Sequence, residues 1–298
     1  MTLSPKMRIF RTLPLVALLA FTVGCTKFGQ TDSGTTPTSP SGPPAAGSSL
    51  TYSAVGASDV IGFGSTTPCF VFEDCNGTGY VWVAARQLRG QGFTVAVGNL
   101  GIPGGVISRT FQDLGTQIGR TMPGNFIDQE MPFVSRSASL VTVFAGGNDV
   151  NVITGALGAG LGGSNQTGYI DDKVTQFNAD YATLISGIRA RATGARIIVL
   201  NLPNMAGIPY LANASLAQKQ AAQRASVRMT TIGINALKDV TVIDLMCDTR
   251  MYQSNIYSSD GFHPNDAGYQ ILGAEVVKAL TTSSYPAPKT SCPQMTIY

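Results

Sequence analysis

The feature of this chain that most constrains its fold is a regular alternation of strand-like and helix-like segments. The strand-like segments are 51–58, 93–99, 140–149, 196–203 and 240–245, and the helix-like segments are 79–90, 106–119, 172–192, 215–237 and 265–280. Strands that alternate with helices in this way form parallel sheets covered by helices on both faces. The sequence therefore predicts a single α/β domain with five parallel strands between two helical layers.

Several residues with useful chemistry directly follow predicted strands. Ser58 closes the first strand-like segment, residues 99–101 follow the second, and residues 146–149 follow the third. In parallel α/β sheets, ligands bind beyond the carboxyl ends of the strands. We therefore expect these residues to lie together at one edge of the sheet.

The glycine-rich run 155–168 has no hydrophobic period and contains the pattern GxGxxG at Gly158, Gly160 and Gly163. A dinucleotide-binding loop would need this pattern between the first strand and the first helix of a βαβ unit, and the run does not lie there. We therefore expect a mobile loop that borders the site, with a passive surface loop as the alternative.

The N-terminus has the features of an export signal. Residues 1–24 combine the basic residues Lys6, Arg8 and Arg11 with an apolar run that is short for a membrane span, and Cys25 follows directly. The segment resembles a bacterial lipoprotein signal, although Thr22 stands where leucine is usual, and an ordinary secretory signal is the alternative. Without these residues the chain has 17 basic and 17 acidic residues, so its charge favours no nucleic-acid partner.

The segment after Cys25 predicts a tether to the cell envelope. Residues 26–50 are rich in Ser, Thr, Pro and Gly, which is typical of a flexible linker. A lipidated Cys25 would anchor an exported protein in a bacterial membrane, and a freely secreted protein is the alternative. The expected organisation is a signal peptide (1–24), a lipidated cysteine with its linker (25–50), a folded domain (51–285) and a C-terminal tail (286–298).

The cysteine count is odd, which is informative in an exported protein. The five cysteines are Cys25, Cys69, Cys75, Cys247 and Cys292. If Cys25 carries a lipid, the other four can form two disulfides. Cys69 with Cys75 would close a short loop and Cys247 with Cys292 would hold the tail, although the sequence leaves other pairings open.

His263 is the only histidine of the chain and the only possible imidazole base. Asp260 lies three residues before it and Asp266 three residues after it, so spacing alone allows either carboxylate to orient the ring. A single histidine does not suit a zinc site, and we expect neither a metal nor an organic cofactor.

The nucleophile and the oxyanion donors are expected at the ends of the strands. Ser58 lies at the end of the first strand, without the G-x-S-x-G pattern of α/β-hydrolases around it. Gly101 offers a backbone N–H, and Asn148 offers a side-chain amide that can donate to an oxyanion.

Four stretches together resemble the signature blocks of the SGNH (GDSL-type) hydrolase family. They are Gly56–Asp59, Asn99–Gly104, Gly146–Asp149 and Asp260–His263, in the order of the family. The resemblance implies a flavodoxin-like α/β/α fold, a Ser58–His263–Asp260 triad, and an oxyanion hole formed by the N–H groups of Ser58 and Gly101 and the Asn148 amide. One departure is Ala57, because the family usually has aspartate before the serine.

The resemblance predicts a serine esterase or lipase that hydrolyses small-molecule or lipid esters through an acyl-enzyme. Three alternatives use the same architecture. Two are enzymes, an O-deacetylase of glycan or peptidoglycan and a thioesterase, and the third is a lipoprotein that binds acyl or cell-wall ligands without turnover.

Overall fold

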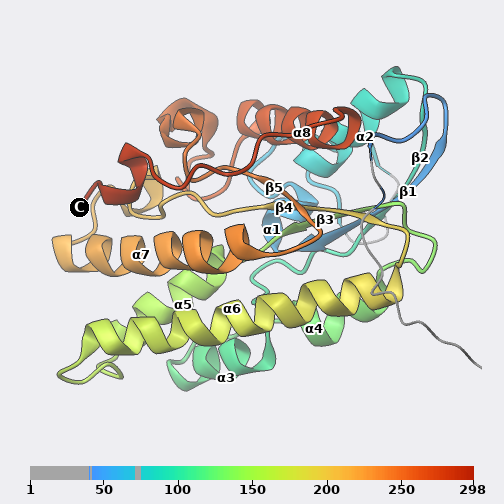
Figure 1. Cartoon of the computed structure of the whole chain (residues 1–298). Coiled ribbons are helices and arrows are strands. Elements are labelled where there is room, and N and C mark those ends of the chain that lie inside the picture. Colours follow the sequence, from blue (N-terminus) through green and yellow to red (C-terminus); the bar gives the residue numbers. More distant parts are fainter. Residues whose placement is uncertain (1–39, 41, 71–74) are drawn as a thin grey trace, which may run out of the picture. The chain divides into compact units, whose positions relative to one another are not determined.

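The strand-like segments form one parallel sheet in the computed structural model, which describes residues 40, 42–70 and 75–298. The strands of this part are β1 (Ser49–Gly56), β2 (Thr94–Asn99), β3 (Leu140–Phe144), β4 (Arg196–Leu200) and β5 (Thr241–Ile243). They lie in the order β2-β1-β3-β4-β5, and every neighbouring pair is parallel (Figure 1). The predicted sheet is confirmed, and its order is the flavodoxin-like one.

Helices cover both faces of the sheet. The helices of the described part are α1 (Ser58–Ile61), α2 (Tyr80–Gly90), α3 (Arg109–Gln117), α4 (Phe126–Gln129), α5 (Gly147–Gly158), α6 (Gln166–Arg191), α7 (Leu216–Arg228) and α8 (Asp266–Thr281). In Figure 1, α2 and α8 lie on one side of the sheet and α3 to α7 on the other, which confirms the three layers. Among the described residues, no helix has the length and apolarity needed to cross a bilayer.

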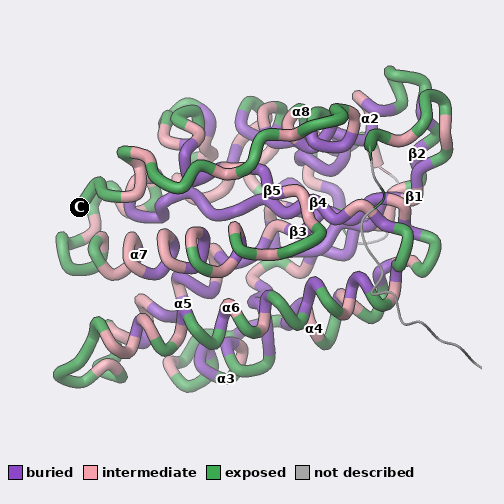
Figure 2. The backbone as a smooth tube through the Cα atoms, in the orientation of Figure 1, coloured by how far each residue is buried: buried purple, intermediate pink, exposed green. Residues whose placement is uncertain are grey.

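The strands are apolar throughout because both faces of the sheet are buried. In β4, Ile197 and Val199 pack into the core against α5 to α7, while Ile198 and Leu200 pack into the core against α2 and α8. Figure 2 shows the strands as the most buried part of the domain. Side chains of consecutive strand residues point to opposite faces, so the continuous apolar run fills both cores at once.

The segment after β3 differs from the prediction. The sequence predicted a glycine turn at 146–149 and a loop at 155–168, whereas α5 begins at Gly147 and continues to Gly158. The helix was not predicted because its glycines lower helix propensity. It forms because Val150 and Ile153 are buried against the core. Residues 155–168 therefore contain the end of α5 and the start of α6, and none of them lines the cavity beside Ser58.

The helix predicted at 215–237 is also shorter in its α-helical part. It ends at Arg228, continues as a π-helical turn over Met229–Gly233, and closes with a 3₁₀ turn over Ile234–Ala236. The helix predicted at 172–192 starts earlier, at Gln166, where Asn165 caps it.

Two disulfides are present, in the pairing that the sequence analysis considered first. Cys69 pairs with Cys75, with 6.1 Å between their Cα atoms, and Cys247 pairs with Cys292, with 5.8 Å between theirs. Cys25 and the signal segment lie outside the described residues, so the predictions for them remain predictions.

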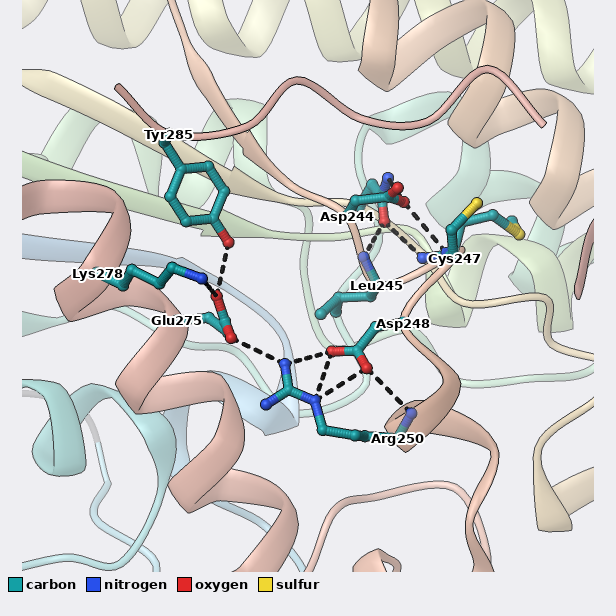
Figure 3. A network of polar contacts seen from close by, with 10 residues as sticks. Asp244, Leu245, Cys247, Asp248, Arg250, Glu275, Lys278 and Tyr285 are labelled. Carbon is teal, nitrogen blue, oxygen red and sulfur yellow. Dashed lines mark hydrogen bonds and ion pairs between the residues drawn. The ribbon is translucent and has the colours of Figure 1, made fainter. Parts of the chain in front are cut away.

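A polar network beside the second disulfide holds the C-terminal tail. Glu275 of α8 accepts hydrogen bonds from Arg250 at 2.8 Å and from the Tyr285 hydroxyl at 2.8 Å, and Asp248 pairs with the same arginine at 2.6 Å (Figure 3). The network joins the loop after β5 and α8 to Tyr285, and the Lys289 N–H of the tail donates to Asp244 Oδ2 of the same loop at 3.0 Å. Three separate parts of the sequence are therefore fixed at one place.

Candidate active site

Three side chains predicted to act together form one hydrogen-bonded chain. Ser58 Oγ lies 2.7 Å from His263 Nε2, and His263 Nδ1 lies 2.6 Å from Asp260 Oδ2. Ser58 comes from the start of α1, and the other two come from the loop that precedes α8, where His263 lies 205 residues further along the chain. The fold thus brings a hydroxyl, an imidazole and a carboxylate into line.

Hydrogen bonds keep the Asp260 carboxylate ionised. Partial burial alone would raise its pKa, but hydrogen bonds from the His263 ring and N–H, the Ser258 hydroxyl and the Phe262 N–H outweigh this and lower the pKa to about 2. An ionised carboxylate is the form that accepts the Nδ1 proton and favours a positive charge on the ring.

Asp266, the other carboxylate at the same spacing from His263, has a different partner. It accepts hydrogen bonds from the N–H of Thr66 at 2.8 Å and from its hydroxyl at 2.7 Å. Gly261 makes the turn that favours Asp260, since its φ of 68° lies in the left-handed region and a Cβ there would meet Tyr210 N at 2.8 Å. The backbone of the loop therefore places Asp260, and not Asp266, against the His263 ring.

The turn that carries Ser58 depends on a second glycine. Gly56 ends β1 with a φ of 144°, and a Cβ there would lie 2.1 Å from the carbonyl oxygen of Phe144. The chain then turns directly into α1, whose first residue is Ser58. The first N–H groups of a helix have no intrahelical acceptor, so the Ser58 N–H is available to a ligand.

The first turn of α5 holds the glycine loop after β2. Asn148 Nδ2 donates to the carbonyl oxygen of Gly105 at 2.9 Å, and Asp149 Oδ1 accepts from the N–H of Ile107 at 3.0 Å. Asp149 is fully buried, and burial raises its pKa to about 7. No role was predicted for Asp149, which is part of the contact between the start of α5 and the glycine loop.

The prediction that Gly101 donates to an oxyanion does not fit the structure. Its N–H already donates to Asn99 Oδ1 at 3.0 Å, and a Cβ at Gly101 would lie 2.9 Å from the Ala57 carbonyl oxygen. Glycine is needed here for close packing. Gly104, three residues on and next to the Gly105 carbonyl that binds Asn148, has an N–H without a hydrogen-bond partner among the described residues.

A buried acidic residue that the sequence analysis missed lies under these turns. Glu130 accepts hydrogen bonds from the N–H of Gly56 at 2.7 Å and from the N–H of Ile102 at 3.1 Å. It is far from both residues in the sequence, and only the fold brings them together.

A small apolar cavity of about 50 Å³ lies beside Ser58 and His263 and is lined by their chain neighbours among others. Its lining includes Ala57, Gly147, Asn148, Leu202, Met205 and Phe262. Two further aromatic rings pack beside this region. The ring centroid of Phe63 lies 4.7 Å from that of His263, and the ring centroid of Tyr210 lies 5.0 Å from that of Phe262. The side chains Phe63 and Tyr210 are 47% and 42% exposed.

The sequence of the chain matches a family model over most of the folded domain. Residues 45–271 match the GDSL-like lipase/acylhydrolase family. The chain belongs to this family. It is therefore a carboxylic ester hydrolase, and the predicted family is confirmed. Among curated proteins, none matches the chain.

Solved structures are similar to the chain at low sequence identity, and the lipase with a TM-score of 0.50 shares its fold. A lipase from a goat rumen metagenome (Lip_vut3) is 16% identical, with a TM-score of 0.50 over 77% of this chain and 97% of that one. A mutant of Axe2, an acetyl-xylooligosaccharide esterase from Geobacillus stearmophilus, is 16% identical, with a TM-score of 0.49 over 82% of this chain and 98% of that one. At such identities the likeness concerns the fold alone.

Proposed function

We propose that this hydrolase is a serine esterase that uses Ser58, His263 and Asp260 as a catalytic triad. The observation that carries the proposal is the unbroken hydrogen-bonded chain from Ser58 Oγ through the His263 ring to Asp260 Oδ2, at 2.7 and 2.6 Å. The carboxylate holds the proton on Nδ1, so that Nε2 faces the serine as a base.

The reaction follows from this arrangement in two steps. His263 takes the Ser58 proton as Oγ attacks the ester carbonyl, and it then gives that proton to the leaving alcohol. The acyl group remains on Ser58 until a water molecule, activated by the same ring, releases it as a carboxylic acid. Both steps pass through an oxyanion.

We assign the oxyanion hole to the Ser58 N–H, the Gly104 N–H and the Asn148 amide. Gly104 replaces the predicted Gly101, whose N–H is bonded to Asn99. Asn148 Nδ2 has a second hydrogen besides the one given to the Gly105 carbonyl, and this bond keeps its amide beside the glycine loop. Fixed donors of this kind stabilise developing negative charge without reorganising during the reaction.

The apolar surroundings favour an ester with an apolar acyl or alcohol group. The cavity beside Asn148 is lined mainly by aliphatic and aromatic side chains, and the exposed rings of Phe63 and Tyr210 pack against His263 and Phe262. Apolar walls with a few polar groups are typical of sites for small organic molecules.

The test is the hydrolysis of p-nitrophenyl esters from acetate to palmitate by the purified full chain, beside Ser58→Ala and His263→Ala. We expect turnover by the wild type and its loss in both variants. Turnover that survives in Ser58→Ala would refute the triad. A folded wild type that hydrolyses no ester would direct attention to thioesters, acetylated glycans and binding without turnover.

We also propose that Cys25 carries a lipid that anchors the exported enzyme to a bacterial membrane. The signal-like segment before it and the tether-like composition after it support this, and the other four cysteines are paired with each other. Cys25→Ser is expected to move the enzyme from the membrane fraction to the soluble one, and continued sedimentation with membranes would count against the anchor.

A further inference from the structure

Glu130 lies at the point where β1 and β2 separate, under the turns that carry the proposed oxyanion donors. Its side chain is fully buried. The β1–β2 ladder continues past the end of β2, since Leu100 N donates to the Ala54 carbonyl and Ile102 N to the Gly56 carbonyl. Just beyond, Glu130 Oε2 accepts the Gly56 N–H at 2.7 Å and Oε1 the Ile102 N–H at 3.1 Å.

Both backbone groups that Glu130 binds are two residues from a proposed donor. Gly56 precedes Ser58 by two residues, and Ile102 precedes Gly104 by two residues. One carboxylate therefore connects the nucleophile turn to the glycine loop. A shift of the carboxylate would change the distance between the two N–H groups that must point at one oxygen.

The backbone around Glu130 is itself held against the glycine loop. The Asn125 side chain caps α4 by accepting the Asp128 N–H at 2.9 Å, and the Glu130 N–H donates to the Phe126 carbonyl at 3.1 Å. The N–H of buried Phe126 donates to the carbonyl of Val106 at 3.0 Å. The carboxylate is thus presented from a short, fixed segment.

We propose that Glu130 is a positioning residue for the oxyanion hole, whose carboxylate fixes the Ser58 and Gly104 N–H groups relative to each other. The inference rests on the proposed function. Without this acceptor the buried Gly56 N–H is left unpaired, which costs stability, and the Ile102 N–H keeps only the Gly56 carbonyl, so the turns above them are free to shift. Displacements of about 1 Å in a catalytic site can lower rates by about 100-fold.

The environment of Glu130 also affects the charge of its carboxyl group. Burial raises its pKa well above the usual value, against the two N–H groups that favour the ionised form. A carboxyl group that is easily neutralised puts less negative charge near a developing oxyanion than a freely ionised one would.

The first test compares kcat and KM for p-nitrophenyl acetate in Glu130→Gln and the wild type. The amide keeps the size of the side chain but has only one acceptor oxygen, so one of the two N–H bonds is lost. We expect kcat to fall by about 10- to 100-fold with little change in KM, and the affinity for a boronic acid, which binds as a tetrahedral anion, to fall in proportion.

Asn201 provides the matched control. It is equally buried, and its Oδ1 accepts two backbone N–H groups, from Leu245 at 2.7 Å and Met246 at 3.0 Å, at the ends of β4 and β5. Asn201→Ala should lower the melting temperature while kcat for the acetate ester stays close to wild type, because this bond pair does not support the oxyanion donors.

The outcomes separate the two proposals. An unchanged kcat in folded Glu130→Gln, or an equal loss of kcat in Asn201→Ala, overturns the positioning role while the triad stands. A folded wild type without ester turnover overturns the proposed function itself. If Glu130→Gln does not fold, Glu130→Asp, whose shorter side chain cannot span both N–H groups, is judged by the same criteria.

Discussion

At the level of single residues, Asp260 is distinguished from Asp266 only by where the backbone places it. Asp260 accepts hydrogen bonds from the His263 ring and from the N–H groups of Phe262 and His263, whereas Asp266 accepts from Thr66. The two carboxylates therefore form a matched pair for testing which one supports catalysis.

We predict that Asp260→Asn lowers kcat by roughly 10³- to 10⁴-fold, as loss of the orienting carboxylate does in other serine hydrolases. The amide can donate toward Nδ1 and so favours the wrong tautomer. Asp266→Asn should leave kcat close to wild type. The measurement is steady-state hydrolysis of p-nitrophenyl acetate, and equal losses in both variants would contradict the assignment.

A second residue-scale prediction concerns Asp149 and pH. Burial raises its pKa from 3.8 to about 7, so the folded chain binds more protons than the unfolded chain between these values. Its contribution to stability is therefore present below pH 4 and is lost as the pH rises to 7 and above. Asp149→Asn, which keeps an acceptor for the Ile107 N–H, should show a smaller fall in melting temperature than the wild type between pH 5 and pH 8. An identical fall in both would refute this.

At the level of elements, the start of α8 fixes the position of His263. Asn265 caps this helix by accepting the N–H groups of Ala267 and Gly268, and its amide donates to the carbonyls of Asn255 and Tyr257.

We predict that Asn265→Ala destabilises the fold by about 1 kcal/mol or more and also lowers kcat, because the loop that holds His263 loses its support. Asn165→Ala is the control, since Asn165 caps α6 by accepting the Gly168 N–H and has no contact with the triad. Asn165→Ala should lower the free energy of unfolding, measured in urea, and leave kcat for ester hydrolysis unchanged. Equal kcat losses would show that any lost cap affects the enzyme.

Sequence patterns predicted the elements wherever local signals were strong. The five strands are apolar runs bounded by turn residues, and α8 combines a capping residue with an apolar face. α5 was missed because its signals conflict: it starts at a glycine and ends in a glycine-rich run, and only contacts with the core favour the helix. Tertiary packing overrides propensity in such segments.

Some residues of the site could be predicted from the sequence and others could not. His263 stood out as the only histidine, and the order of the four blocks pointed to Ser58. The role predicted for Gly101 was wrong because its N–H donates to the Asn99 side chain. The contacts of Glu130 are with residues 74 and 28 positions away in the sequence. No local pattern carries such information.

At the scale of the whole molecule, the Cys247–Cys292 disulfide and the polar network of Figure 3 attach the tail to the sheet. This disulfide closes a segment of 45 residues, whereas Cys69–Cys75 closes one of 6. Longer closed loops restrict the unfolded chain more, which corresponds to a stabilisation of about 4 kcal/mol for the larger loop.

We therefore predict that replacing Cys247 and Cys292 by serine lowers the free energy of unfolding by more than the same replacement of Cys69 and Cys75. Denaturant unfolding of the two double variants measures this. A larger loss in the variant without the short loop would indicate that native contacts around Cys69 matter more than the entropy of the unfolded chain.

Ser58 is the proposed nucleophile on which the whole mechanism depends, and covalent labelling tests its role most directly. The full chain is treated with a fluorophosphonate, and the modified residue is located by mass spectrometry. We predict one label per chain, on Ser58, formed far more slowly in His263→Ala and absent in Ser58→Ala. A label on another residue, or undiminished labelling of Ser58→Ala, would contradict the claim.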